Sequence, residues 1–271
     1  MTAMRTMVTT LISLTLLAGV LPVNGDSITA KVTDGWGEEV TVQGYNDAKL
    51  PDGKWFVHDP NRPQPKAVAP GPSPTLGKKP PQGAVVLFDG TDLSKWKNDK
   101  WKLEDGAMIA GGGSQVTKDG FGSCQLHLEF ATPKEAKGGG QGRGNSGVII
   151  MSRYEIQVLD SWHNATYPDG QCASVYGQHP PAVNASRAPG EWQTYDITWH
   201  APKFEGGKVV EPARVTVIHN GVKVQDNFEL IGAVAHRNLA KYAPHSPKEP
   251  LTLQDHGNPV RYRNIWYVPL D

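Results

Sequence analysis

The chain has 271 residues, and its 27 basic side chains are balanced by 27 acidic ones, so its formal net charge at pH 7 is zero. This balance excludes a global electrostatic field that would recruit nucleic acid or an anionic membrane surface. We therefore expect any partner to be recognised at a local site.

The stretch from Met1 to Gly25 has the pattern of a secretory signal peptide. Arg5 precedes an apolar run from Met7 to Val20, and small residues follow up to Gly25. A retained membrane anchor needs about 20 apolar residues, which is longer than this run, so the pattern favours cleavage near Gly25. We expect a secreted or periplasmic mature chain with no membrane span.

The two cysteines, Cys124 and Cys172, are far apart in the sequence. In an oxidising compartment they could form a disulfide, but spacing alone gives no geometry. Two buried thiols are the alternative.

Composition divides the mature chain into three segments. Residues 26–59 form an N-terminal arm that ends in the aromatic stretch Trp55, Phe56 and His58. Aromatic residues in an extended arm usually dock, so we expect the arm to pack over the main domain. Prolines are so frequent over residues 60–82 that neither a helix nor a central strand can persist, which predicts an extended linker. Residues 83–271 form the main domain.

The main domain consists of short runs of β-branched and aromatic residues separated by turn residues. Asn220-Gly221 and Asp105-Gly106 have the composition of type I′ hairpin turns. These features predict an all-β, antiparallel sandwich with an N-terminal extended arm. The expected strands are 84–88, 101–104, 107–111, 124–130, 147–160, 173–177, 192–199, 214–219, 222–230, 251–256 and 261–270.

The run 147–160, "GVIIMSRYEIQVLD", is expected to be one long central strand with an unusual polar row. Because side chains alternate along a strand, Glu155 and Gln157 share a face. Asp160 joins that face only if a β-bulge shifts the register by one residue. The row is either an ordinary solvated face or part of a site.

Two loops and one strand end supply further polar candidates. Arg143 and Asn145 lie in the glycine-rich stretch 135–147, whose glycines let the chain bend closely around a ligand. The loop 160–181 combines Trp162, His163, Tyr167 and Tyr176 with polar turns, a mixture that suits sugar rings. Gln254 and His256 end a strand before a Gly-Asn-Pro turn, with Asp255 beside the histidine. His256 is either a base that titrates near neutral pH or a turn residue bonded to the backbone.

A metal site is left open by these residues. His163 and His179 lie in the same loop without a fixed pattern of further ligands, which is a weak signature for a transition metal. Loop carbonyls and carboxylates could instead hold calcium. No nucleophile elbow of the G-x-S-x-G type is present.

Four collinear motifs resemble a known family. They are "AVVLFDGTDLSKWK", "GNSGVIIMSRYEIQVLDSW", "GEWQTYDITW" and "LQDHGNPVRYRNIWYVPL", and they are similar to the domain of unknown function numbered 1080, also called the 3-keto-disaccharide hydrolase domain. The similarity covers about residues 83–271. It implies a concanavalin A-like jelly-roll sandwich and, as substrates, glycosides whose glucose C3 hydroxyl has been oxidised to a ketone.

A ketone at C3 acidifies the C2 proton, so a base can remove it and the group at C1 can leave; water then adds to the enone. This route needs a base, a group that stabilises the enolate and an acid for the leaving group. We expect the base to be Glu155 or His256, with Asp160 orienting a neighbour or ligating a metal. Enolate stabilisation is assigned to Arg143, His163 or a divalent metal ion. The remaining predicted substrate contacts are Asn145, Gln157, Trp162, Tyr176 and Gln254.

Two alternatives stay open. A retaining glycosidase of the same fold class needs two carboxyl groups about 5 to 5.5 Å apart, which Glu155 and Asp160 supply only with the bulge. A non-catalytic carbohydrate-binding module needs only an aromatic platform.

Overall fold

The structure is a computed structural model that describes residues 26–270. The predicted signal peptide lies outside the described residues. Within the described range, the chain folds into sixteen β-strands and two short 3-10 helices, and no α-helix is present. The prediction of an all-β antiparallel fold is confirmed.

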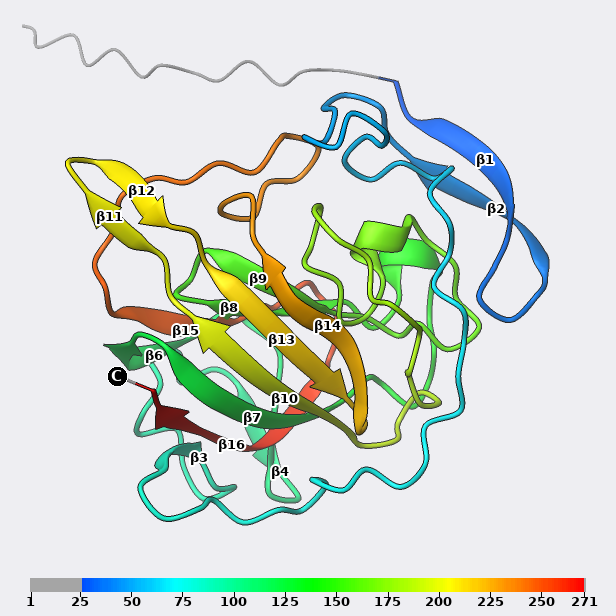
Figure 1. The fold of residues 1–271 in the computed structure, drawn as a ribbon. Helices are drawn as coiled ribbons and strands as arrows, with labels where there is room; N and C mark the ends of the chain where they lie inside the picture. The colour runs from blue at the N-terminus through cyan, green and yellow to red at the C-terminus, as the bar shows by residue number, and fades with distance from the viewer. Residues whose placement is uncertain (1–25, 271) are drawn as a thin grey trace, which may run out of the picture.

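Two antiparallel sheets form the main domain (Figure 1). The larger sheet has the order β14 (Val222–Glu229), β13 (Arg214–His219), β10 (Gln193–His200), β7 (Cys124–Ala131), β16 (Arg261–Pro269), β5 (Ala107–Ile109) and β4 (Lys102–Glu104), and β3 (Val85–Phe88) also pairs with β16. The smaller sheet has the order β6 (Gln115–Phe121), β15 (Glu249–Leu253), β8 (Ser146–Ile150) and β9 (Tyr154–Val158). Two hairpins stand apart from both sheets: β1 (Ile28–Thr33) with β2 (Glu39–Gly44), and β11 (Lys203–Glu205) with β12 (Lys208–Glu211).

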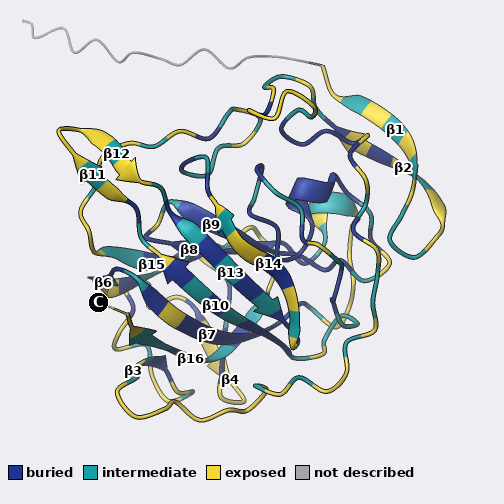
Figure 2. Ribbon diagram, in the orientation of Figure 1, coloured by how far each residue is buried: buried dark blue, intermediate teal, exposed yellow. Residues whose placement is uncertain are grey.

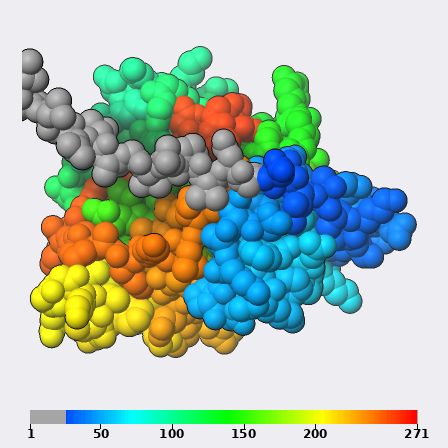
Figure 3. Space-filling view, turned by 90° about the horizontal axis from the view of Figure 1, so that it is seen from above, coloured from blue at the N-terminus to red at the C-terminus, as the bar shows by residue number. Residues whose placement is uncertain are grey.

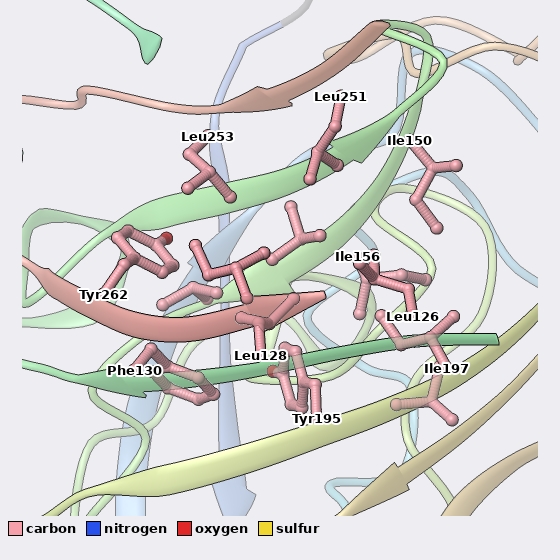
Figure 4. Close-up of a cluster of buried hydrophobic side chains, with 14 of the residues drawn as sticks. Leu126, Leu128, Phe130, Ile150, Ile156, Tyr195, Ile197, Leu251, Leu253 and Tyr262 are labelled. Carbon is pink, nitrogen blue, oxygen red and sulfur yellow. The ribbon is translucent and has the colours of Figure 1, made fainter. Parts of the chain in front are cut away.

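The hydrophobic core fills the space between the two sheets (Figure 4). Alternate side chains of each strand point into it. The inward residues include Leu126, Leu128 and Phe130 from β7 and Ile156 from β9, all of them buried. Burial of each such side chain stabilises the fold by about 1.5 to 3 kcal/mol. The apolar face of each strand therefore points into the core, and the opposite face points away from it.

The run 147–160 is not one strand. It forms two antiparallel strands, β8 and β9, joined by a turn in which Met151 and Ser152 have φ angles of 54° and 53°. The prediction of a single central strand is therefore wrong, and β9 is an edge strand of the smaller sheet. Residues 173–176 cover that edge: Ala173 N–H donates to the Gln157 carbonyl, and Tyr176 N–H donates to the Glu155 carbonyl.

Both predicted type I′ turns are confirmed. Asn220 and Gly221 have φ angles of 52° and 83° between β13 and β14, and Asp105 and Gly106 have 50° and 70° between β4 and β5. Segment 173–177, in contrast, makes only isolated bridges. Strand β6 was missed because Lys118, Asp119 and Gly120 interrupt its apolar pattern.

The N-terminal arm packs on the main domain. His58 is fully buried, and its backbone N–H and ring Nδ1 lie 2.9 and 3.2 Å from the two carboxylate oxygens of Asp169. Arg62 approaches the same carboxylate at 3.6 Å. Burial alone would raise the pKa of Asp169, but the facing His58 and Arg62 hold that pKa below its usual value.

The proline-rich segment 60–82 runs in extended form from the arm along the outer face of the larger sheet; it is the cyan trace in Figure 1. Thr75 donates to Asp196 of β10 at 2.6 Å, and Gly77 N–H donates to Glu129 of β7 at 2.6 Å. We call residues 60–82 the strap. The strap satisfies polar groups on the sheet face that points away from the core.

No disulfide joins Cys124 to Cys172. Both thiols are buried, Cys124 in β7 and Cys172 next to the Tyr195 hydroxyl at 3.1 Å. The alternative of two buried thiols is the one observed. In residues 26–270, no helix has the length and apolarity needed to cross a membrane.

We predict that Asp169→Ala loosens the arm. The substitution leaves the His58 ring and the Arg62 guanidinium buried without their carboxylate, so the free energy of unfolding should fall by roughly 3 to 5 kcal/mol. Urea unfolding measures this loss, and limited proteolysis should cut the arm faster than in the native protein. Glu135→Ala on the exposed loop is the control, and equal stability of the two variants would contradict the proposed anchor.

Candidate functional site

A pocket of about 830 Å³ lies on the outer face of the smaller sheet. This volume is in the range of about 300 to 1,000 Å³ typical of small-molecule sites. Its walls come from the sheet, the glycine-rich loop, the loop before β10, the loop after β14 and the arm. The lining residues are Thr41, Val42, Gln43, Tyr45, Gly139, Gly140, Gln141, Gly142, Asn145, Ile149, Glu155, Gln157, Ala165, Thr166, Tyr167, Tyr176, Val234, His236, Gln254 and His256.

Glu155 is the one carboxylate among the described lining residues. Tyr154 and Ile156 point into the core, so alternation along β9 sends Glu155 and Gln157 to the pocket face. The Glu155 side chain is 6% exposed and makes no hydrogen bond to another residue in 26–270. Burial therefore raises its pKa from 4.5 to about 8.

Gly147 makes room for this carboxylate. A methyl group on Gly147 would collide with Glu155 Oε1, far inside van der Waals contact. The glycine lies on β8, where it pairs with Gln157 in the ladder. The absence of a side chain on the neighbouring strand is thus a condition for the position of Glu155.

An amide network forms the wall next to Glu155. Gln157 Nε2 donates to Gln141 Oε1 at 2.9 Å, and Asn145 Nδ2 donates to the Gln141 carbonyl at 2.7 Å. Gln141 Nε2 donates in turn to the Gly170 carbonyl at 2.8 Å. The buried Gln157 Oε1 has no hydrogen-bond partner in the described part of the chain, so it is available to a ligand hydroxyl.

A chain of phenols and imidazole forms another wall. The Tyr176 hydroxyl lies 2.8 Å from the Tyr167 hydroxyl and 3.2 Å from His236 Nδ1. Burial raises the pKa of Tyr176 above its usual value of 10, so the phenol keeps its proton near pH 7. Desolvation of the His236 ring, with the neighbouring His58 and Arg237, lowers the pKa of His236. A neutral His236 can therefore accept a hydrogen bond from Tyr176.

Gln254 and His256 lie where β15 ends. Gln254 N–H donates to the Gly147 carbonyl at 2.9 Å, which fixes the backbone of this strand end against β8. The Gln254 side chain and the exposed His256 ring make no hydrogen bond to other residues within 26–270, and both line the pocket. Their polar atoms face the space that a ligand would occupy.

Asp160 and Arg143 are not in this pocket. The β8–β9 ladder runs without a register shift from Ser146↔Val158 to Ile150↔Tyr154 and ends before Asp160, which does not line the pocket of Glu155. Asp160 lies beyond the end of β9, and its Oδ2 is 2.9 Å from Arg143 Nε. The pair lines a separate cavity of about 530 Å³. The expected row of three residues is therefore a pair, Glu155 and Gln157.

Trp162 and His163 contact the arm instead of the pocket. The ring of Trp36, in the β1–β2 turn, stacks on His163 with centroids 4.0 Å apart and meets Trp162 edge-on at 4.6 Å. Neither residue lines the pocket. Their aromatic character is explained by docking of the arm.

No group of three or more His, Cys, Asp and Glu side chains placed to hold a metal ion is found in residues 26–270. The predicted candidate His179 is instead bonded through Nδ1 to Gln225 Oε1 at 2.9 Å. The described pocket residues therefore do not form a typical divalent metal site.

Sequence reasoning missed several lining residues. Gln141 lies in the glycine-rich loop that also holds predicted candidates, but one amide among many turn residues gives no periodic signal. His236 and Tyr45 lie in segments far from the other candidates in the sequence. Only the folded arrangement brings them to the pocket.

Comparison with known proteins agrees with this architecture. The model of the 3-keto-alpha-glucoside-1,2-lyase-like domain family matches residues 83–267. The crystal structure of a candidate glycosyl hydrolase from Parabacteroides distasonis ATCC 8503 is similar, with 37% sequence identity and a TM-score of 0.70, over 82% of this chain and 97% of that chain. A second such protein from the same organism has 24% identity and a TM-score of 0.52, over 69% of this chain and 99% of that chain.

A comparison with curated protein sequences finds no match. The solved structures agree with a concanavalin A-like jelly-roll sandwich. Because the family match spans most of the main domain, the chain belongs to the 3-keto-alpha-glucoside-1,2-lyase-like domain family and is a carbohydrate-active protein of the glycosyl hydrolase type.

Proposed function

We propose that the protein cleaves 3-keto-glycosides by removing the C2 proton, eliminating the group at C1 and adding water to the resulting enone. The observation that carries this proposal is that Glu155, the one carboxyl among the described lining residues, is buried with a pKa of about 8 in a pocket lined by amides, phenols and imidazoles. A base with a pKa near the working pH is well matched to a carbon acid.

Glu155 takes the C2 proton in the first step. The electron pair of the C–H bond forms the enolate, whose charge lies on the C3 oxygen. His256 and the Gln254 amide, which have no competing hydrogen bonds within the described chain, donate to that oxygen. These two groups replace Arg143 and His163, since those two side chains lie outside the pocket.

Tyr176 supplies the proton for the leaving oxygen when the C1–O bond breaks. Its phenol is protonated near neutral pH, and it is bonded to Tyr167 and to His236, which can pass a proton back. Water then adds to the enone: its hydroxyl bonds to C1, its remaining proton goes to the Tyr176 phenolate, and Glu155 returns its proton to C2. The net reaction converts a glycoside and water into a free 3-keto sugar and an alcohol.

The pocket argues against direct retaining hydrolysis. That mechanism needs a second carboxyl group about 5 to 5.5 Å from the first. Among the described lining residues, Glu155 is the one carboxylate, and the nearest candidate in sequence, Asp160, is paired with Arg143 in the adjacent cavity. We also propose that the protein is exported, on the basis of the signal-peptide pattern in residues 1–25.

We predict that the purified protein releases 3-keto-glucose from a 3-keto-glucoside and leaves the unoxidised glucoside intact. Glu155→Gln removes the base and His256→Ala removes a donor to the enolate oxygen, so each should lower kcat by at least about 10²-fold. Product release by liquid chromatography measures both effects. Glu205→Gln, an exposed carboxylate on β11, is the control. Release from the unoxidised glucoside would support a glycosidase, and sugar binding without turnover would support a binding module.

We predict that kcat/KM rises with pH, is half-maximal at about pH 8 and levels off only above that pH, because Glu155 must lose its proton to act as the base. Steady-state rates measured from mildly acidic to mildly alkaline pH test this, and a rate that falls as pH passes 8 would make Glu155 the acid.

The same pKa has a consequence for stability that needs no substrate. Between pH 4.5 and about 8 the folded protein keeps a proton on Glu155 that the unfolded chain has released, so stability falls as pH rises across this window. Glu155→Gln removes this dependence. The Tm of the variant relative to the native protein should therefore increase across the same window, and a constant difference would contradict the raised pKa.

We predict that Gly147→Ala lowers kcat at least about tenfold without unfolding the protein. The added methyl group collides with Glu155 Oε1 and displaces the carboxylate. Gly111→Ala is the matched control, since a methyl group there meets no atom within 4 Å. Activity assays and thermal unfolding of both variants separate loss of the base from loss of the fold, and native activity in Gly147→Ala would contradict the proposed position of the base.

A further inference from the structure

The N-terminal arm forms part of the pocket wall. Thr41, Val42 and Gln43 of β2, and Tyr45 just after it, line the same cavity as Glu155. Gln43 is exposed and Tyr45 is half-buried, so both side chains are accessible to a ligand. All four residues lie outside the family match, which begins at residue 83.

Several contacts near the pocket hold the arm in one place. The Arg237 guanidinium lies 4.3 Å above the Tyr45 ring, and its Nε and Nη2 atoms lie 2.6 and 3.1 Å from the Asp47 carboxylate. Arg237 follows the lining residue His236, whose ring meets the Tyr45 ring edge-on with centroids 5.6 Å apart. These contacts, with Trp36 stacked on His163, join the arm to two separate loops of the main domain. Figure 3 shows the blue arm packed against the orange segment, the part of the chain to which His236 and Arg237 belong. The arm is a fixed wall.

The extent of one structural match includes part of this region. The match to the 37% identical protein covers 82% of this chain, which is more than residues 83–271 alone can supply. That match therefore includes residues that precede residue 83. The match to the 24% identical protein covers 69% of this chain, a share that the main domain alone can supply. Part of the segment before residue 83 is therefore included in the match to the more similar protein, whereas the match to the less similar protein does not require it.

The lining residues divide into two sets with different tasks. Every group assigned to the reaction lies in the matched domain: Glu155, Tyr176, Gln254, His256 and the supporting His236.

A cavity of about 830 Å³ is larger than one sugar ring requires. The arm side presents the Thr41 hydroxyl, the Gln43 amide and the Tyr45 phenol, and no lysine or arginine lines the cavity in the described range. Uncharged hydrogen-bonding groups beside an aromatic ring suit a neutral, hydroxylated ligand.

We propose that β2 and Tyr45 form the subsite for the leaving group, and that this subsite takes a second sugar ring in preference to an apolar aglycone. The inference rests on the proposed function, because it uses the keto-sugar ring at Glu155 to divide the cavity. Gln43 donates and accepts hydrogen bonds with hydroxyls of the second ring, and Tyr45 packs against it. The arm thereby sets which glycosides are cleaved, while the main domain performs the reaction.

The test compares two substrates that share the reacting ring, a 3-keto-disaccharide and methyl 3-keto-glucoside. Gln43→Ala should lower the ratio of their kcat/KM values, disaccharide over methyl glucoside, by about tenfold, the value of a hydrogen bond to a sugar hydroxyl. Tyr45→Leu should change the ratio in the same direction. Thr29→Ala is the matched control, since Thr29 is the exposed β1 partner of Gln43 and does not line the cavity.

A ratio that is unchanged in Gln43→Ala, or equal losses on both substrates, would overturn the subsite. Failure of the proposed function gives a different result, because the native protein then cleaves neither substrate. In that case calorimetry with the unoxidised disaccharide and methyl glucoside decides. Weaker binding of the disaccharide alone in Gln43→Ala supports the subsite, and identical binding by the variant and the native protein overturns it.

Discussion

The burial of the Glu155 carboxyl on the outer face of the smaller sheet is the constraint on which the site depends. The outward face of a two-layer sandwich normally meets water, and a carboxyl there keeps an ordinary pKa. Glu155 instead has a pKa of about 8 because other parts of the chain cover this face. The cover consists of the glycine-rich loop, the loop before β10, the loop after β14 and the N-terminal arm. Figure 2 shows β9 buried along its length although it is an edge strand.

The polar neighbours of Glu155 form hydrogen bonds with one another and none with its carboxyl group. Gln157, Asn145 and Gln141 exchange hydrogen bonds, and Tyr176 bonds to Tyr167 and His236. None of these donors is directed at Glu155, and no lysine or arginine of the described chain lines the cavity. An arginine in place of a neutral neighbour would lower the pKa of Glu155 and weaken it as a base. Arg143 is paired with Asp160 in the adjacent cavity, where the carboxylate balances the charge of the guanidinium.

The sequence was sufficient to predict the fold class, two turns and part of the pocket, for identifiable reasons. Alternation and Asn-Gly or Asp-Gly turns are local signals, and collinear motifs identify the family. Glu155, Gln157, Asn145, Tyr176, Gln254 and His256 all line the pocket. The turn at Met151 and Ser152 was missed because neither residue usually adopts a positive φ angle. The placement of Asp160, Arg143, Trp162 and His163 failed for a different reason: their partners, including Trp36, are set by tertiary packing that no local pattern encodes.

The strap and the arm also make completion of the pocket depend on the sandwich. The strap crosses the outer face of one sheet and the arm covers the other, so one N-terminal segment contacts both faces of the sandwich. Its anchors are distant in sequence: His58 pairs with Asp169, 111 positions later, and Ser73 contacts Thr194, 121 positions later. Each anchor joins the N-terminal segment to a residue that the sandwich holds in position, so the contact requires both parts to be in place. The pocket therefore reaches its final shape only when the arm and the sandwich have come together.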